Sequence, residues 1–247
     1  MKKTFLATIC LFAGMSIYAQ QIDVQPVPQK VIPATQTIKL TGTYLLNGIN
    51  DANPFAAEAL KTILGTSESM KGGMKVFIGE RGDKAVSKYK KFIPAQAEGY
   101  FVRISPKEIV LAGYDERGTY YAVQTFRQLI ENGQVPVTEI TDWPDIRFRG
   151  VVEGFYGTPW SHEARLRHLK FYGQNKMNTY IYGPKDDPYH SSPNWRLPYP
   201  EQEAKQIKEL VQIAKENAVN FVWAIHPGKD IKWNQEDRDN LLGKFQK

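Results

Sequence analysis

Residues 149–160 read RGVVEGFYGTPW, a short β-branched run that stops at a glycine and continues into aromatic residues and proline. This run favours a strand over residues 147–153, and the residues that follow favour a helix over 163–172. The pattern repeats downstream, with strands expected at 178–182 and 220–226 and helices at 201–217 and 236–245. Alternation of this kind is typical of parallel βα units.

These units occupy residues 147–247. A (β/α)8 barrel of roughly 250 residues uses about 31 residues per unit, so about three βα units fit here. A small open sheet of three parallel strands is the alternative. Because the sequence stops at residues 245–247 without a cap, a turn or a polar tail, we interpret it as an incomplete α/β (β/α)8 TIM barrel.

Residues 20–142 have a different pattern of expected elements, in which short strands are mixed with helices. Strands are expected at 73–79, 99–105 and 108–112, and the last two flank a turn and predict a hairpin. Helices are expected at 54–64, at 84–92, and from Asp115 to a stop at Asn132-Gly133. We therefore expect a small α+β N-terminal domain with a supporting role.

Residues 1–19 have the pattern of a secretory signal peptide. Lys2 and Lys3 precede an apolar run over 5–18, which ends at Ala19. Cys10, the only cysteine, lies inside that run and not at its small-residue exit, which favours plain export over a lipid anchor. We expect cleavage near Ala19, export to the periplasm or the medium, and a mature protein without cysteine.

The composition is that of a globular protein, with 42% hydrophobic and 23% charged residues. It excludes disordered, collagen-like and membrane-bundle classes. The formal net charge of +6 is spread along the chain, and its densest cluster, Lys88, Lys90 and Lys91, favours a solvated helix face over a nucleic-acid site. Outside the leader no run approaches the roughly 20 apolar residues of a membrane span. We expect no nucleic-acid partner and no membrane span.

The expected strands end in residues suited to binding a sugar. Ligands of parallel α/β folds bind beyond the carboxyl ends of the strands. Those ends carry Glu153, Gly154 and Tyr156, then Lys185, Asp186 and Asp187, and finally His226. Aromatic faces stack on sugar rings, lysine binds hydroxyls, and glycine lets a ligand approach the main chain. This rim therefore predicts a sugar site.

The carboxylates and glycines of the rim also have structural interpretations. Glu153 is equally explained as a buried carboxylate paired with Arg147 or Arg149, and Gly154 and Gly157 as parts of a tight turn. Adjacent carboxylates at 186 and 187 suit general acid/base chemistry, but Asp187-Pro188 is also ordinary turn chemistry.

The histidines favour structural roles. His226 before Pro227 is typical of a hydrogen-bonded residue at a strand end, and His162, His168 and His190 lack the spacing of metal ligands. The sequence has no phosphate-binding glycine loop and no nucleophile elbow. We expect neither a metal nor another cofactor.

Three motifs resemble the first three barrel strands of glycoside hydrolase family 84. They are residues 149–160, residues 176–188 (KMNTYIYGPKDDP) and residues 223–228 (WAIHPG). Residues 115–122 (DERGTYYA) resemble the small α+β domain that precedes the barrel in families 84 and 20. Family 84 contains bacterial O-GlcNAcases and β-N-acetylglucosaminidases, also called hyaluronidase-like enzymes, some of them exported. The chain is identified as the N-terminal portion of a member.

The resemblance implies a retaining hydrolase that removes terminal β-linked N-acetylglucosamine from glycans or glycoproteins. In the mechanism it implies, the acetamido oxygen of the sugar attacks the anomeric carbon and forms an oxazoline. One carboxylate orients the amide N–H, and its neighbour protonates the leaving oxygen and later activates water. No metal or organic cofactor is implied.

The resemblance also assigns individual residues. Gly154 falls where the family contacts the sugar through its main chain, and Lys185 where a lysine binds a sugar hydroxyl. The catalytic Asp-Asp pair of the family follows the fourth strand, which we expect beyond Lys247, whereas Asp186 and Asp187 belong to the second-strand motif. We therefore expect no catalytic residue in this chain and no activity from it alone.

Two alternatives remain open. One is a non-catalytic sugar-binding or interaction protein built from the α+β domain and a partial barrel. The other is a family 20 β-N-acetylhexosaminidase, with a broader substrate range.

Overall fold

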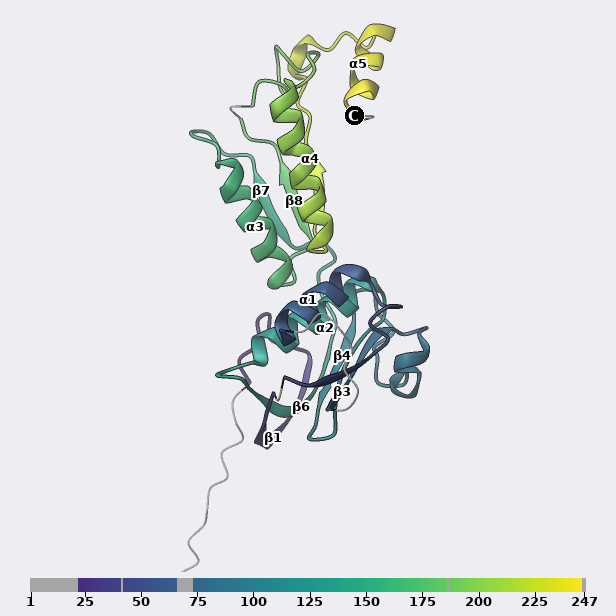
Figure 1. Ribbon diagram of the computed structural model, residues 1–247. Helices are drawn as coiled ribbons and strands as arrows, with labels where there is room; N and C mark the ends of the chain where they lie inside the picture. Colours follow the sequence, from purple (N-terminus) through teal and green to yellow (C-terminus); the bar gives the residue numbers. More distant parts are fainter. Residues whose placement is uncertain (1–21, 41, 66–72, 186, 246–247) are drawn as a thin grey trace, which may run out of the picture.

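The computed structural model describes residues 22–40, 42–65, 73–185 and 187–245, which are arranged around two sheets (Figure 1). The sheets lie one above the other in this view, and helices α1 (Pro54–Leu64) and α2 (Glu116–Leu129) lie between them. The expected signal peptide at residues 1–19 and the candidate residue Asp186 lie outside the described residues.

The first sheet has six strands in the order β1-β6-β4-β5-β3-β2. Their bounds are β1 (Lys30–Lys39), β2 (Tyr44–Asn47), β3 (Met74–Glu80), β4 (Tyr100–Ile104), β5 (Glu108–Gly113) and β6 (Gln134–Asp142). The strands β2, β3 and β5 run parallel, whereas β4 pairs antiparallel with both β5 and β6, and β1 antiparallel with β6. The hairpin expected over residues 99–112 is thereby confirmed as β4 and β5.

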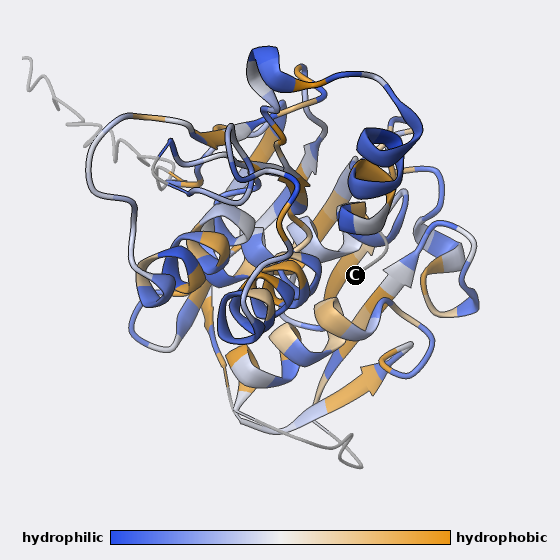
Figure 2. Cartoon of the chain, turned by 90° about the horizontal axis from the view of Figure 1, so that it is seen from above, coloured by the Kyte–Doolittle hydropathy of each residue, from blue (hydrophilic) through white to orange (hydrophobic). Residues whose placement is uncertain are grey.

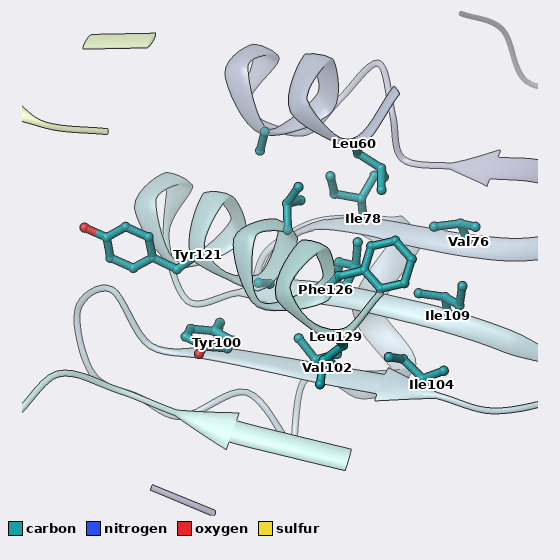
Figure 3. Close-up of a cluster of buried hydrophobic side chains, with 14 of the residues drawn as sticks. Leu60, Val76, Ile78, Tyr100, Val102, Ile104, Ile109, Tyr121, Phe126 and Leu129 are labelled. Carbon is teal, nitrogen blue, oxygen red and sulfur yellow. The ribbon is translucent and has the colours of Figure 1, made fainter. Parts of the chain in front are cut away.

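Local capping explains where α1 and α2 begin. The side chain of Asn53 accepts hydrogen bonds from the amides of Phe55 and Ala56 at 3.0 and 3.1 Å, and Asp115 Oδ1 accepts one from Gly118 N at 2.8 Å. Both helices pack on the same face of the six-stranded sheet, over the core shown in Figure 3. Side chains labelled there include Leu60, Val76, Ile78, Tyr100, Val102 and Phe126.

The helix expected over residues 84–92 is a short 3-10 helix, η1 (Lys84–Tyr89). Residues three apart lie on one side of a 3-10 helix, so Val86 and Tyr89 both bury against the second face of the sheet. Phe101 and Val110 of the sheet belong to the same cluster. A helix is therefore present where one was expected, and it is a 3-10 helix that ends at Tyr89.

The second sheet consists of β7 (Gly150–Glu153), β8 (Thr179–Tyr182) and β9 (Asn220–Trp223), all parallel. Helices α3 (His162–Gln174) and α4 (Glu201–Glu216) cover one face, and the 3-10 helix η2 (Gly228–Asp230) and helix α5 (Gln235–Phe245) follow β9. Figure 2 shows hydrophobic residues along the strands and hydrophilic residues on the outer turns of the helices. The expected order of βα units is therefore confirmed.

The other face of this sheet is open in the part of the chain that the structure describes. Val152, Ile181 and Val222 lie side by side in register on that face. Val152 is 61% exposed and Val222 is 41% exposed, which is unusual for β-branched residues in the middle of a strand.

Polar contacts join the two sheets where β7, β8 and β9 begin. The carboxylate of Glu98 accepts hydrogen bonds from Arg149 at 2.5 Å, Arg117 at 2.8 Å and Asn178 at 2.9 Å. Arg117 also donates to Asn220 Oδ1 at 2.9 Å. Arg149 and Asn178 immediately precede β7 and β8, and Asn220 is the first residue of β9. Each strand is therefore held at its start by Glu98 or Arg117.

Two charged groups at this junction are buried. Burial alone would raise the pKa of Glu98, but the hydrogen bonds from Arg149, Asn178 and Arg117 outweigh it and lower the pKa. Lys176, in the turn before β8, is only 4% exposed, and its Nζ donates to the carbonyl of Gln25 at 3.2 Å. Burial lowers the pKa of Lys176 to about 8.

Candidate functional site

The carboxyl ends of β7, β8 and β9 meet at one edge of the second sheet. The amide of Gly183 donates to the carbonyl of Glu153 at 3.0 Å, and the amide of Ala224 donates to the carbonyl of Tyr182 at 2.8 Å. The ladder therefore continues one residue past β8 and past β9, and the segments that follow the strands start side by side. These segments carry Gly154, Lys185 and His226.

Gly154 lies beside Gly183. Gly183 precedes Lys185 by two residues in the chain. A Cβ at position 154 would approach Val152 Cγ1 to 3.3 Å and the carbonyl oxygen of Gly183 to 3.9 Å, so the fold itself demands glycine only weakly there. Gly157 differs, because its φ of 106° strains any residue with a side chain. The tight-turn interpretation therefore fits Gly157, whereas Gly154 leaves its backbone accessible at the sheet edge.

Lys185 follows the end of β8 in a turn closed by a hydrogen bond from the amide of Asp187 to the carbonyl of Pro184 at 3.0 Å. The side chain of Lys185 is exposed, and no ion pair involves it among the described residues. Its ammonium group therefore has donors available to a ligand.

The side chain of Glu153 points away from the open face of the second sheet, toward the helices. It is fully buried and receives two hydrogen bonds from Arg165 of α3, at 2.7 and 2.9 Å. The hydroxyl of Tyr180 and the amide of Trp160 also donate to it. The expected pairing with Arg147 or Arg149 is therefore wrong, because the pleat of β7 directs Glu153 to α3 while Arg149 is bound to Glu98. Glu153 is a structural carboxylate.

Asp187 is likewise enclosed by donors, whereas its neighbour at position 186 lies outside the described residues. The carboxylate of Asp187 accepts from the hydroxyls of Tyr182 and Tyr199 at 2.9 and 2.8 Å and from the amide of Tyr189 at 2.7 Å. Burial, followed by the negative charge of Asp187, raises the pKa values of Tyr182 and Tyr199. Both hydroxyls therefore stay protonated and donate, which agrees with the loop-holding interpretation of Asp187.

Tyr156 and His226 stand at the outer rim. Tyr156 is 85% exposed in the segment after β7, where its neighbour Phe155 packs on the ring of Trp160 with 5.4 Å between centroids. His226 is held through its main chain, since its amide donates to the carbonyl of His190 at 2.7 Å and its carbonyl accepts from Ser192 at 3.2 Å. The imidazole of His226 is exposed.

Known proteins match both parts of the chain. The model of the β-N-acetylglucosaminidase family matches residues 149–247, and that of glycosyl hydrolase family 20, domain 2, matches residues 21–143. Protein O-GlcNAcase of Rattus norvegicus is 44% identical over 93 residues, and its Mus musculus counterpart gives the same values. The solved structure of CpGH84B has a TM-score of 0.83 and 36% identity over 92% of this chain, and that of CpGH84D has 0.79 and 26% over 92%. Over the matched residues the chain is O-GlcNAcase-like and resembles the N-terminal portion of family 84 glycoside hydrolases.

This O-GlcNAcase-like portion covers a limited share of its relatives. The rodent matches extend over 38% of this chain and 10% of each rodent protein. The match to CpGH84B spans 41% of that chain, and the match to CpGH84D spans 42%. The chain is thus a glycosidase by resemblance, matched over a fraction of each relative.

The structure reveals site residues of this family 84 portion that the sequence did not single out. His190 is buried, and its Nε2 donates to the carbonyl of Pro184 at 2.6 Å, next to Lys185. Arg196 makes two hydrogen bonds with the carboxylate of Asp237 and one with that of Asp230, which joins the loop after β8 to the segment after β9. The sequence shows these residue types but not which of them meet.

Two further properties concern the part of the chain that the structure describes. No group of three or more His, Cys, Asp or Glu side chains there is arranged to hold a metal ion. Within the same residues, no helix has the length and apolar character needed to cross a membrane.

Proposed function

We propose that residues 147–247 form the first part of a (β/α)8 barrel, about three βα units, and carry the sugar-binding rim of a retaining β-N-acetylglucosaminidase. Residues 20–142 form the α+β domain that precedes it. One observation carries the proposal: Gly154, which is partly exposed, and Lys185, whose exposed ammonium group makes no ion pair with any described residue, extend from adjacent ends of parallel strands.

The open face of the second sheet supports the barrel. The row formed by Val152, Ile181 and Val222 is apolar and uncovered, although the opposite face is packed against α3 and α4. Inward-facing positions of a (β/α)8 barrel are filled by branched apolar side chains, which strands on the far side bury. Closure of a barrel is therefore the arrangement that explains this row.

The residues of this chain bind and orient the sugar in the proposed reaction. The main chain at Gly154 contacts the ring, and the ammonium group of Lys185 donates to a hydroxyl. The acetamido oxygen of the sugar then attacks the anomeric carbon and forms an oxazoline while the glycosidic C–O bond breaks. Of a carboxylate pair from after the fourth strand, one member orients the amide N–H and the other protonates the leaving oxygen. Substrates are N-acetylglucosamine-containing glycans or glycoproteins, in keeping with the relatives named O-GlcNAcase.

A chemical-shift titration of the 247-residue chain with N-acetylglucosamine measures sugar binding and thereby tests the rim. We expect Lys185→Met to weaken binding about tenfold, since it removes a charged donor. Gly154→Ala should weaken binding while leaving the thermal midpoint nearly unchanged, because the new Cβ meets only one close side-chain atom. Lys205→Gln, which breaks an exposed ion pair on α4, is the matched control. It should change neither the affinity for the sugar nor the thermal midpoint. Equal affinity of both Lys185 forms would contradict the rim, and equal binding of N-acetylgalactosamine would favour family 20.

Hydrolysis gives a second test. We expect the purified 247-residue chain to show no turnover of a chromogenic β-N-acetylglucosaminide, because the acid/base pair belongs after a fourth strand. Turnover that Asp186→Ala or Asp187→Ala abolishes would instead place the acid/base pair in this chain.

We also propose that residues 1–19 direct export and are removed near Ala19. The basic start, the apolar run and the small residue at its end support this proposal. Mass spectrometry of the protein recovered outside the cytoplasm should give a chain that begins near Gln20. An intact N-terminus in the cytoplasm would contradict export.

A further inference from the structure

The segment that carries Lys185 is fixed by an unusual concentration of hydrogen bonds on Asp187. Three donors from separate positions converge on its carboxylate: two tyrosine hydroxyls and one backbone amide, all within 2.9 Å. The backbone of Asp187 is also fully used, since its amide closes the turn on Pro184 and its carbonyl accepts from Ser191 Oγ at 3.1 Å. The carboxylate of Asp187 therefore serves as an acceptor for three donors that hold this segment in place.

The direction of Asp187 separates it from the sugar. Tyr182, which donates to it, lies in register with Glu153 and Trp223. Glu153 and Tyr182 both face the helices, where each is buried. Asp187 and Tyr182 line one cavity of about 290 Å³ together with Ile207 and Leu210 of α4. The carboxylate of Asp187 is therefore behind the rim, on the helix side.

Asp187 connects the ends of two strands. Tyr182 is the last residue of β8, and Tyr199, the second hydroxyl donor, accepts a hydrogen bond from the indole Nε1 of Trp223 at 3.1 Å. Trp223 is the last residue of β9. The path from Tyr182 through Asp187 and Tyr199 to Trp223 thus fixes the turn of Lys185 against both strands.

We propose that Asp187 is a positioning residue for sugar binding, which acts by fixing the turn from Pro184 to Asp187 and thereby the direction of Lys185. The inference rests on the proposed function, because it takes Lys185 as a contact of the sugar. It assigns Asp187 a role different from general acid/base catalysis. The carboxylate form is required, since an amide at this position presents N–H groups to donors that need an acceptor.

Asp187→Asn in the 247-residue chain tests this role with N-acetylglucosamine as the probe. We expect the affinity to fall about tenfold, because small displacements of a binding group cost this much or more. Tyr199→Phe removes one of the three donors and should cause a smaller loss in the same direction. Lys205→Gln again serves as the control on α4, and circular dichroism checks that each variant is folded.

A double-mutant cycle with Lys185→Met separates positioning from general destabilisation. If Asp187 acts through Lys185, Asp187→Asn causes no further loss of affinity once Lys185 has been replaced. Additive losses would overturn the proposal, and so would a single Asp187→Asn variant that binds within twofold of the wild type.

The indole N–H resonance of Trp223, assigned with Trp223→Phe, reports the bridge independently of sugar. It should shift in Asp187→Asn, and an unchanged resonance would overturn the connection through Tyr199. A wild-type chain that does not bind N-acetylglucosamine would contradict the proposed function itself. A wild type that binds, with an equally active Asp187→Asn variant, would contradict only the positioning role.

Discussion

Lys176 carries an ammonium group that the fold has almost entirely removed from water. Its folded pKa of about 8 lies below the ordinary lysine value of 10.5, so the unfolded chain binds the proton more tightly. Between about pH 8 and pH 10.5 the unfolded state holds more protons than the folded state. The contribution of Lys176 to the free energy of unfolding therefore rises with pH across this window.

Lys176→Met should remove that pH dependence. We expect the variant to be more stable than the wild type at pH 7 by roughly 2 kcal/mol, the cost of the buried charge less the lost bond to Gln25. The advantage should shrink steadily toward pH 10. Urea unfolding of both proteins at pH 7, 8, 9 and 10 measures the difference. A constant difference would show that Lys176 is protonated equally in both states.

At the residue scale, the sequence predicted positions along the chain better than contacts between side chains. Gly154 and Lys185 follow strands, as their motifs indicated, and their role in sugar binding stays a prediction. The partner of Glu153 was missed because the choice among arginines depends on the face of β7 to which the carboxylate points. That face is set by the packing of α3, which brings Arg165 to within 2.7 Å.

At the scale of elements, β7 and β8 approach each other more closely at Gly150 than any side chain permits. A Cβ at position 150 would be 1.6 Å from the carbonyl oxygen of Thr179. Gly150→Ala must therefore push the two strands apart where their ladder begins. We expect a loss of about 3 kcal/mol in the free energy of unfolding.

Gly243→Ala in α5 provides the matched control for this substitution. Its Cβ would meet no atom within 4 Å, and alanine favours a helix over glycine, so no loss is expected. Urea unfolding at one pH compares the two variants. Similar stability of the Gly150 variant and the wild type would mean that the ladder accommodates the extra carbon.

The positions of most elements followed from hydrophobic periodicity, and α1 has the expected bounds, but the ends of two strands in the second sheet were wrong. The third expected strand, 220–226, ends at Trp223, because the chain beyond it joins the loop after β8 through the bridge between Ser191 and His226. The first expected strand, 147–153, begins only at Gly150, since Arg149 is directed to Glu98. Both strand ends are decided by long-range hydrogen bonds, which produce no hydrophobic periodicity in the sequence.

At the scale of the molecule, Glu98 joins the two sheets through hydrogen bonds from Arg149 and Asn178. Removing its charge leaves Arg117 and Arg149 without their carboxylate partner at a largely buried site. We expect Glu98→Gln to lower the free energy of unfolding at pH 7 by roughly 3 kcal/mol. Hydrogen exchange should also accelerate at the first amides of β7, β8 and β9.

The contribution of Glu98 to the free energy of unfolding should depend on pH. Because its folded pKa is lowered from 4.5, its contribution is present above pH 4.5 and is lost as the pH falls below that value. The difference between the wild type and Glu98→Gln should therefore narrow between pH 4.5 and pH 3 in urea titrations. Gln128, which is half-buried and carries no charge, offers the control substitution Gln128→Ala, for which the difference from the wild type should stay constant over the same range.

The overall arrangement of the strands could be predicted only in part from the sequence. Sequential parallel pairing of β7, β8 and β9 follows from the alternation of strands and helices. The neighbours β1 and β6, in contrast, are about a hundred residues apart, and their pairing depends on which edge of the first sheet remains free. No local pattern reports that choice.

The attachment of each strand of the second sheet to Glu98 or Arg117 has a consequence for the order of assembly. Residues 22–142 precede Arg149 in the chain, whether the chain emerges from the ribosome or from an export channel, so the first sheet and α2 have the opportunity to fold first. Arg149, Asn178 and Asn220 then emerge one after another, and each can meet a partner that is already in place. Strands whose pairing is slow to nucleate thereby acquire their order of assembly from the direction in which the chain emerges.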